Sequence, residues 1–447
     1  MKFCLQNATK CGRLGVITEI SRLPEMALET PLLLLYTKGG SVPHLTHEVL
    51  EMVSNEKHPL CVSLPTTIHM HSPVAEIKKG LASFIGMKDY VIYCGVQDPA
   101  VVSPSGYNEK GAVSVWPRSG NHSLTPDMYM DLIEAFQPDM YQALCDGDTD
   151  IHSSKKRTRK CVDRTSEFLK HCVRRHKASK TLQSSSLFAV IEGGYSVHAR
   201  QESARAAAQH PVSGFVIDGL HTNGPDVEKI TFSSIREVIQ ETVKLLPEDK
   251  PRITHGCWNP DMVLKLVESG IDVFDSSYPF IVSERGSALV FCNSLDYEHT
   301  KQHSPDSPIK EEETNKSINI DSQKQAVKSD KGENCKNLNS DSEAIVHSST
   351  TGANGVHDSN DTVYEISLKD DRFREDFEPV VASCQCLCCK KHTRAYIHHL
   401  LMTNELLAPV LLSVHNMHHY LAFFRSIRTA VTKGDLELLR NNIKLKM

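Results

Sequence analysis

The sequence predicts an α/β protein, built on a barrel of parallel strands and followed by a C-terminal zinc-binding subdomain and helices. Short apolar runs alternate with longer amphipathic stretches through the first two thirds of the chain. Apolar runs without polar alternation are typical of strands buried on both faces of a parallel sheet. About eight such runs are present, which favours a closed barrel over an open sheet. A dense cluster of cysteines after residue 383 predicts the metal-binding part.

The expected elements follow one another in order. Strands are expected at 31–37, 59–64, 90–95, 140–145, 187–194, 214–220, 252–256 and 271–275, and helices at about 160–178, 198–209, 226–247 and 260–269. The last helix carries a clear start signal, because Asn259 is a good cap, Pro260 suits the first helical position and Asp261 places an acid in the first turn.

Length and composition narrow the class of protein. The chain has 447 residues, which suits a large barrel with additions. Its net charge is -5, so nucleic-acid binding cannot be argued from global charge and needs a local basic patch. The sequence has no run of about 18 apolar residues, so we expect no membrane span. Its N-terminal segment lacks the apolar core of a signal peptide, so we do not expect secretion. The 14 cysteines therefore indicate a reducing compartment and a metal site, not disulfides.

Composition divides the chain into three parts. Residues 1–296 carry the barrel pattern, and residues 361–447 return to apolar spacing, which is typical of helices from Thr393 onward. Between them, residues 297–360 are rich in Ser, Asn, Asp, Glu, Lys and Gln and nearly lack aromatic residues. Such a segment cannot bury enough apolar surface to order itself, so we expect a disordered polar insertion.

The cysteine cluster predicts one structural zinc ion. Cys386 and Cys389 form a C-x-x-C pair, and Cys384 adds a third thiolate. Cys388 is left out because neighbouring side chains rarely converge on one ion. Closed structural zinc sites take four thiolate or imidazole ligands, so a histidine on a following helix should complete the set. Spacing alone does not choose among the candidates, which are His398, His399, His415, His418 and His419.

The C-x-C-x-x-C pattern, followed after 25 residues by a histidine and with RAYIHHL between them, resembles the zinc subdomain of the tRNA-guanine transglycosylases. In that family the last ligand is the histidine of an HN pair, which here is His415-Asn416. Weaker similarity extends back to about residue 30. We therefore expect residues 1–296 to form one transglycosylase-like domain. The resemblance is closest to the accessory subunits of eukaryotes and implies a (β/α)8 TIM barrel.

The family exchanges a base at a ribose of tRNA. A carboxylate attacks C1′ of the wobble guanosine and expels guanine, as a nucleophile does in retaining glycosidases. Asp275 matches the nucleophile, at the C-terminal end of an expected barrel strand, where barrel active sites lie. Asp146 matches the aspartate that recognises the base.

Other positions depart from the enzymes' pattern. Glu192 stands where the enzymes have the glutamine of Q-G-G, and Asp218 stands at the first glycine of G-G-L. Phe280-Ile281 replaces a Thr-Arg pair after the nucleophile. The enzymes' D-S-G-G-F/Y-Q reads 93–98 here, without the aspartate that acts as general base and without the stacking aromatic residue. Losing one of an acid/base pair costs about 10²–10⁴ in rate.

These departures favour a degenerate, non-catalytic site. The resemblance then implies an accessory subunit that pairs with the catalytic subunit of queuine tRNA-ribosyltransferase and supports tRNA binding. That enzyme exchanges guanine for queuine at the wobble position of tRNAs with GUN anticodons, those for aspartate, asparagine, histidine and tyrosine. Two alternatives stay open: a self-sufficient transglycosylase that uses Asp275, and a zinc-stabilised scaffold with no RNA role.

The resemblance also indicates surfaces and a location. His392, Tyr396 and His399 match family positions in the interface of a heterodimer, and Tyr396, His399 and Leu400 share one helix face by spacing. The basic run 155–160 either contacts tRNA phosphates or is a solvated helix start. Relatives of this type are associated with the cytoplasm and the mitochondrial outer surface, so we expect a cytoplasmic protein with a peripheral fraction on that membrane.

Overall fold

The computed structural model describes residues 1–295 and 362–447, and both stretches belong to one compact unit. The expected insertion at 297–360 lies outside the described residues, and so do the predicted boundaries at 296 and 361. Among the described helices, none is long and apolar enough to cross a bilayer.

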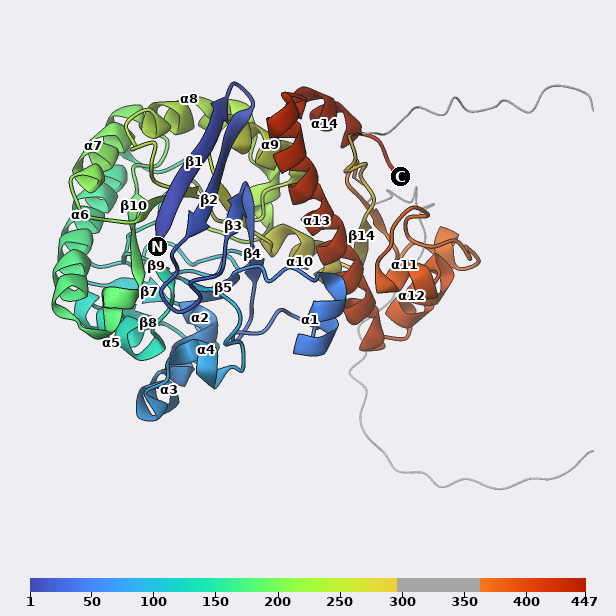
Figure 1. The fold of residues 1–447 in the computed structure, drawn as a ribbon, viewed down its shortest axis with the longest axis horizontal. Coiled ribbons are helices and arrows are strands. Elements are labelled where there is room, and N and C mark those ends of the chain that lie inside the picture. The colour runs from blue at the N-terminus through green and yellow to red at the C-terminus, as the bar shows by residue number, and fades with distance from the viewer. Residues whose placement is uncertain (296–361) are drawn as a thin grey trace, which may run out of the picture. The chain divides into compact units, whose positions relative to one another are not determined.

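The core of the unit is a closed barrel of parallel strands (Figure 1). Neighbours around the barrel follow chain order, and the last strand pairs with the first, as in a (β/α)8 barrel. Seven of the eight strands lie within the predicted apolar runs, and β10 begins one residue before its run. The strands are β4 (Leu32–Tyr36), β5 (Leu60–Ser63), β6 (Ile92–Gly95), β9 (Met140–Gln142), β10 (Ser186–Ile191), β11 (Gly214–Ile217), β12 (Arg252–Ile253) and β13 (Val273–Asp275).

Helices follow the barrel strands and surround the barrel (Figure 1). They are α1 (His47–Val53), α2 (Leu64–Thr67), α3 (His71–Ile77), α4 (Gly80–Phe84), α5 (Pro126–Phe136), α6 (Lys155–Ala178), α7 (Val197–Ala208), α8 (Phe232–Val243), α9 (Pro260–Glu268) and α10 (Ser277–Glu284). The predicted start of α9 is confirmed, since the side chain of Asn259 accepts a hydrogen bond from the amide of Met262 at 3.0 Å. The predicted helix at 226–247 is shorter, because α8 begins only at Phe232.

Three small antiparallel pairings lie outside the predicted pattern. An N-terminal sheet contains β1 (Lys2–Thr9), β2 (Gly12–Thr18) and β3 (Leu28–Thr30). A hairpin of β7 (Val113–Val115) and β8 (His122–Leu124) stands between β6 and α5. The third pair joins β14 (Ser287–Leu289) to β15 (Glu365–Ser367), which lie on opposite sides of the undescribed segment.

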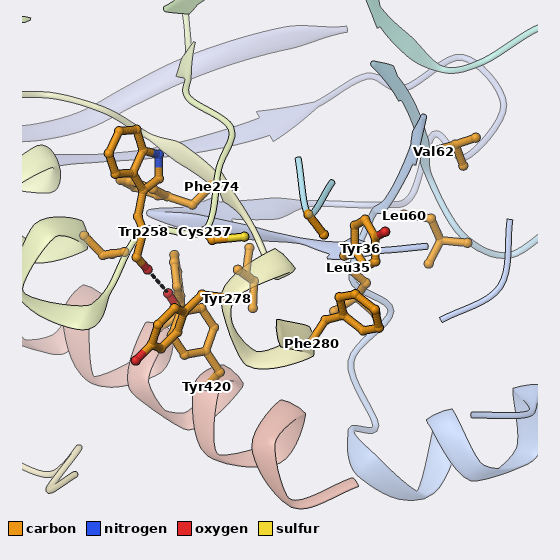
Figure 2. Close-up of a cluster of buried hydrophobic side chains, with 14 of the residues drawn as sticks. Leu35, Tyr36, Leu60, Val62, Cys257, Trp258, Phe274, Tyr278, Phe280 and Tyr420 are labelled. Carbon is orange, nitrogen blue, oxygen red and sulfur yellow. Dashed lines mark hydrogen bonds between the residues drawn. The ribbon is translucent and has the colours of Figure 1, made fainter. Parts of the chain in front are cut away.

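The C-terminal part consists of helices, as the apolar spacing predicts. They are α11 (Leu387–Lys391), α12 (Arg394–Met402), α13 (Leu407–Lys433) and α14 (Leu436–Asn442). Helix α13, red in Figure 1, runs along the barrel beside α10. Its Tyr420 packs beside Tyr278 of α10, with ring centroids 6.1 Å apart, and its hydroxyl donates to the carbonyl of Trp258 at 3.4 Å (Figure 2). The C-terminal helices thus share one hydrophobic core with the barrel.

Candidate functional site

Three cysteines and one histidine converge at the start of the C-terminal helices. Cys384 precedes α11, Cys386 caps that helix and Cys389 lies within it, while His415 lies in α13. The Nδ1 atom of His415 is 3.8, 3.6 and 3.2 Å from the sulfurs of Cys384, Cys386 and Cys389 respectively. All four donor atoms lie within 4.8 Å of one another, so this cluster can hold a metal ion.

Hydrogen bonds behind His415 fix its orientation. Its Nε2 donates to the carbonyl of Leu289 in β14 at 2.8 Å, which leaves the lone pair of Nδ1 directed at the three sulfurs. A second hydrogen-bond partner of this kind orients histidine ligands in metal sites. Asn416 supports the same contact, because its side chain accepts from the amide of Leu289 at 2.8 Å and donates to Ser283 and Ser287.

The structure separates the predicted ligands from their neighbours. Cys388 is buried but is not part of the four-residue cluster, as predicted from its position next to Cys389. Of the other histidine candidates, His398 is buried and its Nδ1 lies 2.9 Å from the carbonyl of Leu368. The choice of His415, which came from the family resemblance, agrees with the cluster that the structure assembles.

Asp275, the candidate nucleophile, lies at the end of β13 as predicted, with a fully buried side chain. Both of its carboxylate oxygens are hydrogen bonded. Oδ1 accepts from the amide of Ser277 at 2.8 Å, and Oδ2 accepts from the amide of Gly256 at 2.9 Å and lies 3.2 Å from Nδ1 of His255. The other nitrogen of His255 lies 2.9 Å from the hydroxyl of Tyr93. The carboxylate is therefore held by the protein's own groups.

Asp146, the candidate base reader, is enclosed by cations. Arg164 donates to it at 2.8 Å, and Arg157 forms a two-pronged ion pair with it. The side-chain amide of Asn108 also donates to it, at 2.7 Å. Burial by itself raises the pKa of a carboxyl, but the two arginines outweigh it and lower the pKa of Asp146. No local pattern identifies Arg164 as a partner of Asp146, because it stands 18 positions away on α6.

Glu192 and Asp218 lie side by side at the ends of neighbouring strands, as the family positions imply. Glu192 follows β10 and Asp218 follows β11, and both approach Cys145. Burial, reinforced by the charge of Asp218, raises the pKa of Glu192 well above its usual value. At Gly219, with φ of +70°, a β-carbon would lie 2.0 Å from Glu192, so only glycine fits beside this carboxyl.

An aspartate does lie near Asp275, on the loop after β6. Asp98 accepts hydrogen bonds from the hydroxyl of Tyr36 at 3.1 Å and from the amide of Ala100 at 3.0 Å. Burial raises the pKa of Asp98, and the negative charge of Asp275 contributes in the same direction. Cys94, on the same strand end, is a poor nucleophile, since burial raises the pKa of its thiol to about 12.

A cavity of about 660 Å³ opens beside these residues, over the ends of β4, β5 and β6. Its lining combines the cations of Lys38 and Arg118 with the carboxyl of Asp98 and the ring of Trp116. The residues that line this cavity include neither Asp146 nor Asp275.

The basic run 155–160 forms the first turns of α6 and is divided in its contacts. Arg157 pairs with Asp146, and Arg159 pairs with Asp163 and Glu202. The lysines of the run are exposed and form no ion pair within the described part of the chain: Lys155, Lys156 and Lys160.

The three candidate interface residues lie close together on the surface of the C-terminal part. His392 and Tyr396 stack with ring centroids 5.3 Å apart and planes inclined by 16°. Tyr396 and His399 are exposed on α12. Leu400, which helical spacing placed on the same face, is instead buried and packs inward. Helical spacing placed Leu400 beside Tyr396 and His399, but spacing alone does not show where the exposed face of α12 ends.

The described fold and cluster define a class: a (β/α)8 barrel joined to a buried Cys3His site. The family model described as queuine tRNA-ribosyltransferase matches residues 7–447, and the chain belongs to this family. It is similar to proteins named queuine tRNA-ribosyltransferase accessory subunit 2. The similarity is 38% identity with the Danio rerio protein over 99% of this chain and 98% of that one. It is 40% with the Gallus gallus protein, over 97% and 94%, and 38% with the Homo sapiens protein, over 99% of each.

Proposed function

We propose that this chain is the non-catalytic accessory subunit of a heterodimeric queuine tRNA-ribosyltransferase. Its catalytic partner would exchange guanine for queuine at the wobble position of tRNAs with GUN anticodons. Support comes from the relatives, which carry the name of accessory subunit and align with this chain from end to end. The cytoplasm, with a peripheral fraction on the mitochondrial outer membrane, is the location that this assignment implies.

The pairing of both candidate catalytic carboxylates within the protein carries the non-catalytic part of the proposal. A nucleophile must direct a free oxygen lone pair at C1′ of the ribose. Each oxygen of Asp275 accepts a hydrogen bond from a backbone amide, and Oδ2 also lies beside His255. These contacts stabilise the carboxylate and weaken it as a nucleophile. A base-reading carboxylate must be open to the base, whereas Asp146 is held by two arginines.

Zinc is the metal that best suits the cysteine–histidine cluster. Zinc binds thiolate sulfur at about 2.3 Å and imidazole nitrogen at about 2.0–2.1 Å, so sulfur and nitrogen ligands of one tetrahedral ion lie about 3.5 Å apart. The three sulfurs are 3.2 to 3.8 Å from Nδ1 of His415. Four protein ligands leave no open coordination position, so the proposed role is structural.

Two surfaces suit the proposed partners. His392, Tyr396 and His399 would contact the catalytic subunit, since Tyr396 is exposed and stacks on the half-buried His392, and tyrosine is enriched among interface anchors. The exposed lysines at the start of α6 would contact tRNA phosphates. Neither surface requires chemistry from this chain.

The test is incorporation of labelled guanine or queuine into tRNA by this chain alone, by the catalytic subunit alone, and by the mixture. We expect turnover only where the catalytic subunit is present and an increase in the mixture. Turnover by the pure chain that Asp275→Asn abolishes would favour the self-sufficient transglycosylase. No effect on the catalytic subunit, together with no association, would favour a zinc-stabilised scaffold.

A further inference from the structure

The ends of three successive barrel strands bring a thiol and two carboxyl groups to one point. Cys145 follows β9, Glu192 follows β10 and Asp218 follows β11. One donor atom from each lies within 4.8 Å of the others. Cys145 and Glu192 are buried, and Asp218 is partly exposed.

The donor atoms face a common space next to Gly147. A β-carbon at Gly147 would lie 2.7 Å from Oδ2 of Asp218 and 3.3 Å from Oε1 of Glu192. The sulfur of Cys145 is 3.7 Å from the same Oδ2 atom. Sulfur and oxygen ligands of one tetrahedral zinc ion lie about 3.5 Å apart. The absent side chain of Gly147 therefore leaves room where these three residues converge.

Oε1 of Glu192 has no hydrogen-bond partner, although the residue is 0% exposed. An unpaired buried carboxylate oxygen is costly unless a proton or a cation meets it. No arginine donates a hydrogen bond to Glu192 in the described structure, although Arg200 is near enough for its charge to act on this carboxyl and its Nη2 has no hydrogen-bond partner. Arg200 donates to the carbonyls of Gly194 and Ile191, and Arg157 and Arg164 bind Asp146.

We propose that Cys145, Glu192 and Asp218 form a second metal site, which binds a divalent first-row cation and preferentially zinc. Its mixed thiolate and carboxylate donors suit zinc better than calcium or magnesium, which prefer oxygen ligands alone. Three protein ligands leave the fourth position to water. The ion neutralises the paired acids and ties together the loops after β9, β10 and β11.

The test counts metal in the full-length protein after loading with zinc and removing loosely bound ions. We expect two zinc ions per wild-type chain and one in Glu192→Gln, which keeps the size of the side chain. Cys145→Ser should also lose one ion. The controls Asp226→Asn, an exposed carboxyl, and Cys172→Ser, a buried thiol outside both clusters, should keep two.

Cobalt loading gives a second reading, because only thiolate ligands contribute sulfur-to-cobalt absorption. Glu192→Gln should keep the strong absorption of the three-cysteine site and lose a weaker component from one thiolate. One zinc ion per wild-type chain, or an unchanged count in both Glu192→Gln and Cys145→Ser, would overturn the proposal and leave a shared proton between Glu192 and Asp218. The count does not depend on partner binding or base exchange, so it fails or succeeds independently of the proposed function.

Discussion

The C-terminal cysteine–histidine cluster and the carboxylates at the ends of the barrel strands differ in how the surrounding protein contacts their polar side chains. In the C-terminal cluster, the protein binds only the far side of the histidine ring and leaves Nδ1 facing three sulfurs. At the end of β13 and on the loop after β9, the protein's own donors contact the carboxylate oxygens of Asp275 and Asp146 directly. The first arrangement leaves the Nδ1 lone pair directed at a possible ion, whereas in the second both oxygens of each carboxylate already accept hydrogen bonds from the protein.

The two regions differ in the chemistry that their side chains can support, which is metal binding in one and base exchange in the other. A structural metal needs convergent donors, and it rewards a rigid set behind them. Base exchange needs an acid and a nucleophile whose oxygens are open to the substrate. In the described part of the chain the cysteine–histidine cluster meets the first requirement, and both candidate carboxylates are engaged by the protein's own groups. This is the pattern expected from the accessory role that we propose.

The largest expected effect comes from removing a ligand of the C-terminal cluster. Cys386→Ser should lose one equivalent of zinc and destabilise the chain severely, because structural zinc contributes about 10–16 kcal/mol of binding free energy in small zinc domains. Elemental analysis and thermal melting measure the two effects. A chelator that strips this ion should lower the melting temperature of the wild-type protein in the same way.

Cys388→Ser is the matched control, since Cys388 is an equally buried neighbour outside the cluster. It should keep its metal and lose far less stability. A fully folded Cys386→Ser protein with unchanged zinc, or metal loss in Cys388→Ser alone, would show that the cluster is assigned wrongly.

The next largest effect tests the ion pairs that hold Asp146 in the barrel site. Arg164→Met removes one of the two cations on Asp146, whose side chain is fully buried. Breaking a buried pair by removing one partner costs about 3–5 kcal/mol, so we expect a loss of about 3 kcal/mol in the free energy of unfolding. Adding Asp146→Asn should recover part of it, because the unpaired charge is then removed.

Arg159→Met is the control for charge and size. Arg159 is more than half exposed and pairs with exposed acids, so its loss should cost about 0.5 kcal/mol or less in chemical denaturation. Equal costs for the two arginines would mean that Asp146 does not depend on its pairing and is free for another role.

The barrel could be predicted from the sequence because most of its strands are continuous apolar runs. LLLLY at β4 and SLFAVI at β10 have no polar alternation, whereas the signal is weaker at β9 and β12, which include Gln142 and Arg252. The hairpin of β7 and β8 and the N-terminal sheet have no such signal. Most of their strands are short, and β1 is largely exposed, so their pairing depends on tertiary contacts that local patterns do not contain.

The candidate sites divide along the same line. Cysteine spacing predicted three ligands, because a C-x-x-C pair brings two sulfurs together within one turn. The histidine came only from family resemblance, since it stands 26 positions from the last cysteine and reaches it through the packing of α13. The arginines on Asp146 and the contact of Cys145 with Asp218 were not predictable, because strand register and helix packing bring these residues together.

Asn416→Ala should have an intermediate effect that separates support from ligation. The side chain makes hydrogen bonds to Leu289, Ser283 and Ser287 in the buried space behind the cluster. Leaving such partners unpaired costs about 1–3 kcal/mol, so we expect a loss of about 2 kcal/mol with zinc retained. Asn442→Ala, which removes a single bond to Ser294, should cost about 1 kcal/mol. Zinc loss in Asn416→Ala would make this residue part of the binding site itself.

The smallest effect on stability, with a clear effect on assembly, is expected at the surface of α12. Tyr396→Ala combined with His399→Ala removes exposed side chains, so melting and zinc content should not change. Truncating an aromatic anchor of an interface costs about 2 kcal/mol, which corresponds to about thirtyfold weaker pairing with the catalytic subunit. The measurement is the dissociation constant of the mixed subunits by sedimentation or calorimetry.

Tyr107→Ala is the matched control for this double variant. Tyr107 is 52% exposed, comparable with 40% for Tyr396, but it lies on the barrel loop between β6 and β7. If loss of any exposed tyrosine weakened pairing equally, the effect would reflect general surface hydrophobicity and not a defined interface. Unchanged pairing in the double variant would move the interface away from α12. Weakened pairing with intact zinc would show that the exposed side chains of α12 make the contact and that zinc binding by α11 and α13 does not depend on them.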